Sequence, residues 1–471
     1  MLIRFNIKNF LSFSARENGD AEEFSMIAGK PDNKKEHILD DGNLQLLKFA
    51  AIYGANAAGK SNLVKALNFM RHTILTGLPR GHTELYSKTH LENKNRNSYF
   101  EVEIKIKDKY YAYGFEVLLT KGKFVSEWLV ELCPSGEEYK IFERNIPDKS
   151  IQFGENIRKD EELNIRLNVY SEDVQENDDT LFLSYMNTNK SNLYARYPAI
   201  GALNDVYRWI ENSLDINYPD RPISGYSYFA NTNSMAEICK MISSFGTGIK
   251  NYKIVDIPIE RALENMPDVV REDILSEMEN TIKQLEEQDM QGKKVKAMGV
   301  TIRNRDDLFI MHVNAKNKDN ISFECKTIRF NHGDDSILFT LGEESDGTIR
   351  LLDLLEILIA GSEKTYVVDE LDRCLHPCLT YRFVELFLQV AQKKNIQLIV
   401  TTHESRLLDF DLLRKDEVWF INKNDAGSSS IYSLDEYNDR FDKKIDKAYL
   451  DGRYGGVPIF NTVFPINGGL K

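Results

Sequence analysis

Alternating apolar and polar residues dominate the amino-terminal part of the chain. An opening segment over residues 3–7 alternates in this way, and further alternating segments cover 99–106, 111–119, 124–132 and 138–143. A period of two places the apolar side chains on one face of a β-strand. Because short turns separate the later segments, they predict an antiparallel meander with one solvated face.

Other segments have different patterns. Residues 49–53 and 396–400 are almost uninterrupted apolar runs, which are typical of parallel strands buried on both faces. Residues 62–75 and 349–360 carry apolar side chains at the spacing of one helix face. Strands and helices that follow one another in this way indicate an α/β protein.

The middle of the chain is polar, charged and helical in character. Within it, residues 267–291 begin with a proline and carry one apolar stripe, which predicts a single amphipathic helix. We therefore expect three parts: an amino-terminal lobe over 1–154, a helical insertion over 155–298 and a carboxyl-terminal lobe over 299–471. The last lobe should open with strands at 300–303, 308–313, 321–330 and 337–341.

A phosphate-binding motif follows the apolar run at 49–53. Residues 54–61 read GANAAGKS and match the pattern G-x-x-x-x-G-K-[ST], with a strand expected before and a helix after. Glycines let the backbone N–H groups turn toward phosphate oxygens, and a simple glycine turn would not require Lys followed by Ser. We expect Lys60 to reach the β and γ phosphates of ATP and Ser61 to bind Mg²⁺. The expected nucleotide-contacting residues of the motif are Gly54, Asn56, Ala57, Ala58, Gly59, Lys60 and Ser61.

Two later strands end in residues that suit hydrolysis. The strand at 365–368 ends in Asp369 and Glu370, and the strand after it ends at His403. A parallel strand beside the phosphate loop would bring Asp369 to the Mg²⁺ ion. Glu370 could then orient or deprotonate the attacking water, and His403 could hydrogen-bond the γ-phosphate or that water. By itself, an Asp-Glu pair could equally be a polar turn at the end of a strand, and a lone His is more often structural.

A further anion-binding candidate lies at the start of the helix over 349–360. Ser345 and Gly347 precede this helix, where a hydroxyl group and an approachable backbone can bind an anion. An ordinary helix cap would have the same composition. The position of these residues just before the Asp369 strand favours a role in the nucleotide site.

Composition excludes several classes of protein. The chain has 471 residues, with 60 Lys and Arg against 73 Asp and Glu, for a formal net charge of −13. This balance argues against a general nucleic-acid-coating protein, although it allows a local basic groove. No run approaches ~18 consecutive apolar residues, and the start lacks the pattern of a secretory signal, so we expect a cytoplasmic protein without a membrane partner. Cys374, His376 and Cys378 could suggest a zinc site. No second ligand pair lies elsewhere in the sequence at zinc spacing, so we do not expect zinc to bind there.

The order of these motifs resembles the heads of ABC-class ATPases, the group that contains the SMC, RecF and overcoming-lysogenization-defect families. The resemblance implies a P-loop NTPase fold of ABC type, with a mixed sheet, an antiparallel β subdomain and an inserted helical subdomain. It also implies head-to-tail homodimers or higher oligomers, in which Ser345 and Gly347 contact the nucleotide of the partner. His403 would then be the switch histidine, and Glu370 the hydrolytic carboxylate.

A closer resemblance is to the ATPases of bacterial abortive-infection modules, of the PARIS and RloA-like kinds. It rests on segments near both ends of the chain, such as NIKNFLSF at 6–13, ESDGT at 344–348, VDELDRCLHP at 368–377 and YLDGRYG at 449–455. It implies a sensor that controls a partner nuclease or toxin encoded nearby and responds to a phage protein or to DNA. The Leu-Ser-Gly-Gly pattern of SMC proteins is absent, and no glutamine loop can be assigned.

Two alternatives differ in what the ATPase acts on. An SMC- or RecF-like ATPase would act directly on DNA in repair or recombination, which the negative charge and the short insertion disfavour. A self-contained nuclease would need a second acidic metal site in a fused domain, and only about 70 residues follow His403.

Overall fold

A computed structural model of the chain describes residues 1–29, 33–79, 81, 83–219, 227–230, 235–264, 266–269, 271–276, 280, 299–303, 307–315, 321–334, 336–359, 361, 363–436 and 449–450. The chain divides into two compact units. The first comprises Met1–Pro219, Gly361–Asp372 and Phe383–Lys471, and the second comprises Asp220–Ala360 and Arg373–Arg382. None of the described helices is long and apolar enough to cross a membrane.

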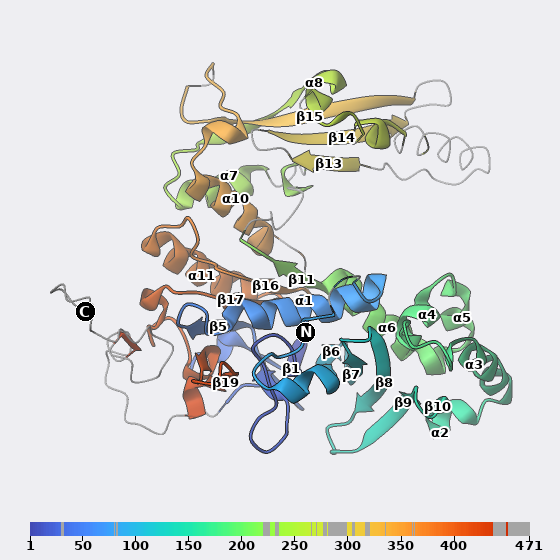
Figure 1. Cartoon of the computed structure of the whole chain (residues 1–471). Coiled ribbons are helices and arrows are strands. Elements are labelled where there is room, and N and C mark those ends of the chain that lie inside the picture. The colour runs from blue at the N-terminus through green and yellow to red at the C-terminus, as the bar shows by residue number, and fades with distance from the viewer. Residues whose placement is uncertain are drawn as a thin grey trace, which may run out of the picture. The chain divides into compact units, whose positions relative to one another are not determined.

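The expected meander forms one sheet of the first unit (Figure 1). Its seven strands are antiparallel and run in the order β10-β9-β8-β7-β6-β1-β2. Buried and partly exposed residues alternate along β6, as the sequence pattern predicts. The strands are β1 (Leu2–Lys8), β2 (Glu22–Ser25), β6 (Ser98–Ile106), β7 (Lys109–Leu118), β8 (Lys123–Leu132), β9 (Glu138–Asn145) and β10 (Ser150–Phe153), and a separate hairpin pairs β3 (Ile38–Asp40) with β4 (Gln45–Leu47).

A second sheet of the first unit carries the strands that lead to the expected site. Its order is β11-β16-β17-β5-β18-β19, with neighbouring strands parallel from β11 to β18 and β19 antiparallel to β18. All six residues of β5 are buried, which fits the uninterrupted apolar run. The strands are β5 (Phe49–Gly54), β11 (Leu214–Asn217), β16 (Thr365–Val368), β17 (Gln397–Thr401), β18 (Val418–Lys423) and β19 (Ser429–Ser433).

One expectation about this sheet is wrong. The strand before Asp369, β16, does not lie beside the phosphate-loop strand β5, because β17 is inserted between them. Parallel pairing nevertheless aligns the three strand ends, with Val368 opposite Val400 and Thr401 opposite Ile52. The polar residues that follow β16 and β17 therefore reach the same edge of the sheet as the phosphate loop.

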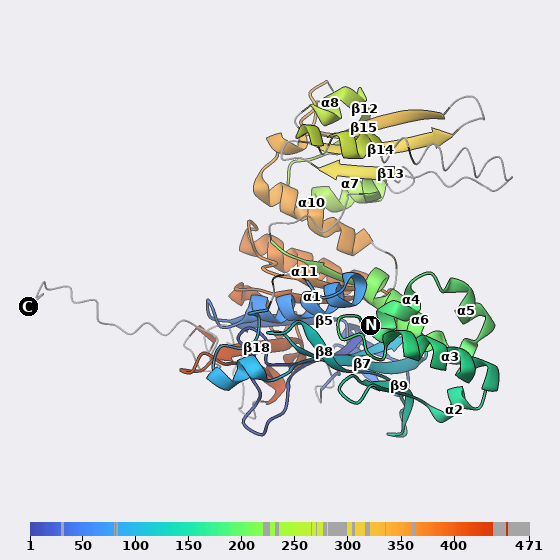
Figure 2. The same cartoon turned by 45° about the vertical axis from the view of Figure 1, so that its right-hand side comes forward.

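The helices of residues 155–208 belong to the first unit and not to a separate insertion. Leu163, Leu183 and Leu203 are buried in the same apolar core as the meander strands. These helices lie beside β8 and β9 in Figure 2. Because they pack on this sheet, the boundary between the first and second units lies at 219/220 and not at the expected residue 155. They are α2 (Glu155–Arg158), α3 (Glu161–Val174), α4 (Phe182–Asn187), α5 (Ser191–Arg196) and α6 (Gly201–Arg208).

A buried glutamine joins the two sheets of the first unit. The side-chain oxygen of Gln397 accepts a hydrogen bond from the backbone N–H of Leu2 (2.6 Å). Its nitrogen donates to the carbonyl oxygens of Leu2 (2.9 Å) and Leu47 (3.0 Å). The amide thus replaces backbone partners at the junction between β1 and β17, where an unsatisfied polar group would be costly.

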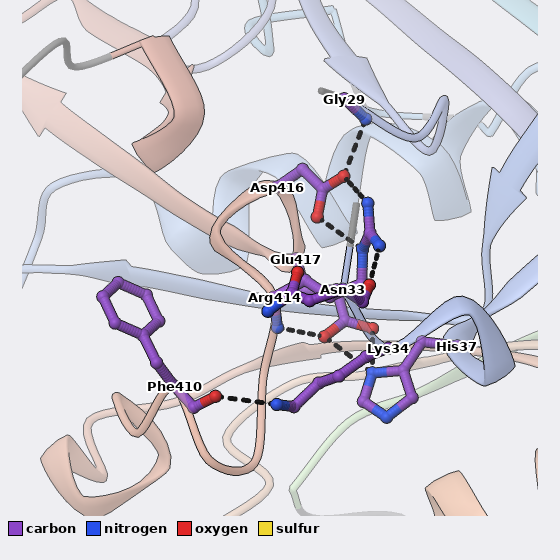
Figure 3. Close-up of polar contacts among 8 residues, drawn as sticks. All are labelled: Gly29, Asn33, Lys34, His37, Phe410, Arg414, Asp416 and Glu417. Atoms are coloured by element: carbon purple, nitrogen blue, oxygen red, sulfur yellow. Dashed lines mark hydrogen bonds and ion pairs between the residues drawn. The ribbon is translucent and has the colours of Figure 1, made fainter. Parts of the chain in front are cut away.

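A buried ionic cluster anchors the start of β18 (Figure 3). The Arg414 guanidinium donates two hydrogen bonds to Asp416 (2.8 and 2.6 Å), and the Glu417 carboxylate lies 2.9 Å from Nδ1 of His37. Burial raises the pKa of Glu417, and His37 opposes part of that effect. Asp416 also accepts from the backbone N–H of Gly29 (2.7 Å). The cluster ties the residues before β18 to the amino-terminal segment, and β18 is the direct neighbour of β5.

The second unit contains a four-stranded antiparallel sheet of order β12-β15-β14-β13. Helix α8 lies against β15 (Figure 1), and its Leu263 is buried with Phe309 and Met311. In the same unit, the Tyr228 hydroxyl donates to the carbonyl oxygen of Leu352 in α10 (2.6 Å). The elements are β12 (Asn251–Asp256), β13 (Gly299–Arg303), β14 (Leu308–Ala315), β15 (Ile321–Asn331), α7 (Met235–Ser244), α8 (Ile259–Leu263) and α10 (Asp346–Ile359).

Two predictions for this region, the strand at 337–341 and the helix at 267–291, are not confirmed. Residues 337–341 do not form a strand, because only Phe339 makes a bridge, to Phe330. The helix expected over 267–291 lies for the most part outside the described residues.

Candidate nucleotide-binding site

The phosphate loop has the expected strand–loop–helix context. Strand β5 ends at Gly54 and helix α1 (Lys60–Thr76) begins at Lys60. Between them, Ala57 and Gly59 adopt left-handed backbone angles, with φ of 64° and 121°. Asn56 and Ala57 are exposed at the tip of the loop, whereas Ala58 and Gly59 are buried. Such a turn points successive N–H groups toward one side, which is the geometry that cradles phosphate oxygens.

Lys60 is the buried cation of the loop. Its side chain is 7% exposed, and its Nζ donates to the carbonyl oxygens of Gly54 (2.7 Å) and Ala55 (3.2 Å). Burial lowers the pKa of Lys60 to about 8, although the carboxylates of Asp369, Asp372 and Glu370 oppose that shift. The loop therefore holds an ammonium group next to the amide donors that a polyphosphate would contact.

Ser61 and Asp369 meet at the start of α1. The Ser61 hydroxyl donates to Oδ1 of Asp369 (3.2 Å), and the Asp369 side chain is buried. A hydroxyl group and a carboxylate at this distance are hard oxygen ligands of the kind that Mg²⁺ prefers in P-loop enzymes. The two residues expected to bind the metal are thus adjacent in space although they lie 308 positions apart in the sequence.

Glu370 follows Asp369 in a left-handed conformation, with φ of 50°. The side chain is partly exposed, and its charge acts on both Lys60 and His403. A partly solvated carboxylate beside the buried metal ligand is suitably placed to contact a water molecule.

His403 follows β17 at the same edge of the sheet. The pKa of His403 is lowered, mainly by desolvation and also by the nearby charge of Lys60. The carboxylates of Asp372, Glu370 and Asp369 oppose this shift. Its backbone N–H donates to Oδ1 of Asp372 (3.1 Å), which also accepts from the hydroxyl of Thr402 (2.6 Å). The first unit therefore brings together the expected phosphate-loop, metal and hydrolytic residues.

Ser345 and Gly347 lie in the second unit, at the start of α10. The Ser345 Oγ accepts from the backbone N–H of Thr348 (3.1 Å), which is the geometry of a helix cap. A Cβ on Gly347 would lie 2.9 Å from the carbonyl oxygen of Cys374, so a larger residue would not fit there. The Ser345 hydroxyl and the Thr348 N–H that form this cap both belong to the second unit.

Several residues that hold this site were not expected from the sequence. Ser429 donates from Oγ to the carbonyl oxygen of Ala58 (2.5 Å) and from its backbone N–H to the carbonyl oxygen of Ser12 (2.7 Å). Asn62 donates to Oγ of Ser12 (2.8 Å). Thr401, at the end of β17, contacts Asp369. Only the polar run that ends at His403 could have pointed to Thr401, and no local pattern marks Ser429.

Comparison with known proteins gives one family match and several distant structural likenesses. No curated protein matches the chain. Among solved structures, an SMC head bound to the C-winged helix domain of ScpA has 11% identity, a TM-score of 0.38 and coverage of 92% of this chain and 97% of that one. An SMC head domain from Thermotoga maritima has 12% identity, a TM-score of 0.33 and coverage of 92% and 98%. A Pyrococcus furiosus Smc head with an extended coiled coil has 14% identity, a TM-score of 0.35 and coverage of 96% and 99%.

The phosphate loop, the parallel sheet and the antiparallel sheet together constitute a P-loop ATPase fold of ABC type. A family model described as "AAA domain, putative AbiEii toxin, Type IV TA system" matches residues 49–409, and the chain belongs to this family.

Proposed function

We propose that the protein is an Mg²⁺-dependent ATPase that works as the regulatory subunit of an anti-phage defence module. The observation that carries the ATPase assignment is the cluster at the phosphate loop, in which Ser61 contacts Asp369 and the charge of Asp369 acts on the buried Lys60. Such a cluster supplies positive charge and oxygen ligands for a metal–triphosphate complex.

The proposed chemistry assigns one role to each of the remaining site residues. Glu370 accepts a proton from the attacking water, and His403 hydrogen-bonds the γ-phosphate or that water. Ser345 and Gly347 complete the site of a second copy of the chain, so that hydrolysis depends on pairing of the heads.

The regulatory part of the proposal is supported by the family to which the chain belongs, whose description names a toxin–antitoxin system. In this proposal the ATPase restrains a separate effector nuclease or toxin and releases it when a phage protein or DNA is sensed. An ATPase that acts directly on DNA is the second candidate, and the net charge of −13 disfavours it.

Replacing Lys60 tests the ATPase assignment. Lys60→Ala removes the cation opposed to the β and γ phosphates, so we expect it to weaken Mg-ATP binding at least ~10-fold, since each ~1.4 kcal/mol changes affinity tenfold. Titration calorimetry measures the affinity. Lys65→Ala, which replaces an exposed lysine on the same helix, is the matched control and should bind as the native chain does. Equal affinity in all three proteins would refute nucleotide binding at this loop.

A further inference from the structure

Thr401 hydrogen-bonds the residues after β16 through its side chain as well as through its backbone. Its Oγ1 donates to Oδ1 of Asp369 (2.5 Å) and accepts from the backbone N–H of Glu370 (2.8 Å). Its carbonyl oxygen accepts from the backbone N–H of Leu371 (3.0 Å). One residue at the end of β17 therefore contacts the three consecutive residues that follow β16.

These contacts constrain both expected carboxylates. Asp369 Oδ1 accepts from two hydroxyl groups, one of Thr401 and one of Ser61, which orients the carboxylate between β17 and the start of α1. Because Thr401 is buried, water cannot easily replace its hydroxyl. The carboxylate is thus held by a partner outside the phosphate loop.

The backbone of Glu370 is constrained by the same oxygen. A left-handed conformation is unfavourable for a residue with a Cβ, and it persists only where the surroundings enforce it. The bond from the Glu370 N–H to Oγ1 of Thr401, together with the next N–H bound to the Thr401 carbonyl, holds this turn. The direction in which the Glu370 side chain leaves the strand therefore depends on Thr401.

We propose that Thr401 is a positioning residue of the hydrolytic site, which sets the orientation of Asp369 toward the metal and of Glu370 toward the attacking water through a single hydroxyl group. This inference rests on the proposed ATPase function. In this role the hydroxyl acts indirectly, through the carboxylate of Asp369 and the backbone N–H of Glu370. Outer contacts of this kind typically change metal affinity or activity by ~10–100-fold when they are lost.

The test compares Thr401→Val with Thr401→Ser. Valine keeps the shape of the side chain and removes the hydroxyl, whereas serine keeps the hydroxyl. We expect Thr401→Val to lower kcat and to raise the Mg²⁺ concentration for half-maximal turnover, each by ~10-fold or more. Its affinity for ATP measured without Mg²⁺ should stay within about 3-fold of the native value, because the loop contacts of Lys60 remain. Thr401→Ser should recover most of both parameters.

Thr365→Val is the matched control. Thr365 is a buried threonine at the other end of β16, and its hydroxyl donates to Gln397 (3.0 Å), away from the carboxylates. It should leave kcat and the Mg²⁺ dependence unchanged, even if it lowers the unfolding temperature. If Thr401→Val does not fold, Thr401→Ala serves as the hydroxyl-free variant with the same expected values.

The outcomes separate this inference from the proposed function. Absence of ATP turnover in the native chain and in Thr365→Val would overturn the ATPase assignment. Normal turnover in those two proteins, with a folded hydroxyl-free variant that matches them in kcat and Mg²⁺ dependence, would overturn the role of Thr401 alone. A fall in kcat that Thr401→Ser does not recover would also overturn it, since the hydroxyl would not be the cause.

Discussion

At the scale of single residues, Asp369 and Glu370 are neighbours in sequence but lie in different environments. Asp369 is buried and accepts from two hydroxyl groups, so it is suited to hold a cation. Glu370 is partly exposed, so it is better suited to contact water. The difference arises because β16 ends just before them and the backbone turns at Glu370. Two adjacent carboxylates can therefore have separate roles.

Glu370→Gln should keep ATP binding and slow hydrolysis by ~10²-fold or more, the effect expected when help from a general base is lost. The amide keeps the shape of the side chain but cannot take a proton from water. Phosphate release under saturating ATP measures the effect, and calorimetry checks that binding is retained. Glu363→Gln, which replaces an exposed carboxylate that precedes the same strand, is the control. Unchanged turnover in Glu370→Gln would make His403 the next candidate for the base.

At the scale of elements, the phosphate loop is braced by segments from both ends of the chain. Ser429 at the start of β19 and Ser12 near the amino terminus pack closely against Gly59. A Cβ added to Gly59 would lie 2.5 Å from Oγ of Ser429 and 2.8 Å from Oγ of Ser12. Both hydroxyls are engaged, with Ala58 and Asn62 respectively. The conformation of the loop thus depends on the hairpin β18–β19 as well as on its own glycines.

Gly59→Ala should therefore destabilise the loop in two ways, through its φ of 121° and through the lack of space. We expect an unfolding free energy lower by ~1–3 kcal/mol from backbone strain, and Mg-ATP binding weakened by ~10-fold or more. Gly136→Ala is the matched control, since Gly136 has a φ of 85° and a Cβ added to it would meet no atom within 4 Å. It should show a smaller loss of stability and no loss of binding. Equal effects of the two substitutions on binding would mean that the contacts with Ser12 and Ser429 are unimportant.

At the scale of the whole molecule, the expected nucleotide residues are divided between the two units. Lys60, Ser61, Asp369, Glu370 and His403 belong to the first unit, and Ser345 and Gly347 to the second. In the ABC-type arrangement that we propose, the helix that follows Ser345 faces the nucleotide of another copy of the chain. A single chain would then hold ATP with half of a site.

Mixing Lys60→Ala chains with Ser345→Arg chains tests this arrangement. Each variant alone should hydrolyse ATP poorly, whereas a mixed dimer contains one composite site with both native residues, and activity should recover. Phosphate release measures recovery, and native chromatography shows whether mixed dimers form. The Lys60→Ala variant alone, at the same total concentration, is the control. Mixed dimers without activity would indicate that Ser345 acts within its own chain or that both sites must work together.

The sequence by itself determined the features that depend on neighbouring residues. The phosphate loop lies within eight consecutive residues, and the meander follows from the period-two pattern, so both could be predicted. The carboxylates after β16 and the histidine after β17 were also identified, because an apolar run that ends in polar residues is a local signal.

Only the tertiary structure determined the features that depend on pairing between segments distant in the sequence. Local pattern did not show that β17 separates β5 from β16, that β11 and β18 join the same sheet, or that the helices after residue 155 pack on the meander. Nor did it identify Thr401 and Ser429, whose partners lie 32 and 371 positions away. The physical reason is the same in each case: a short strand or a single hydroxyl group has no preferred partner until folding brings one to it.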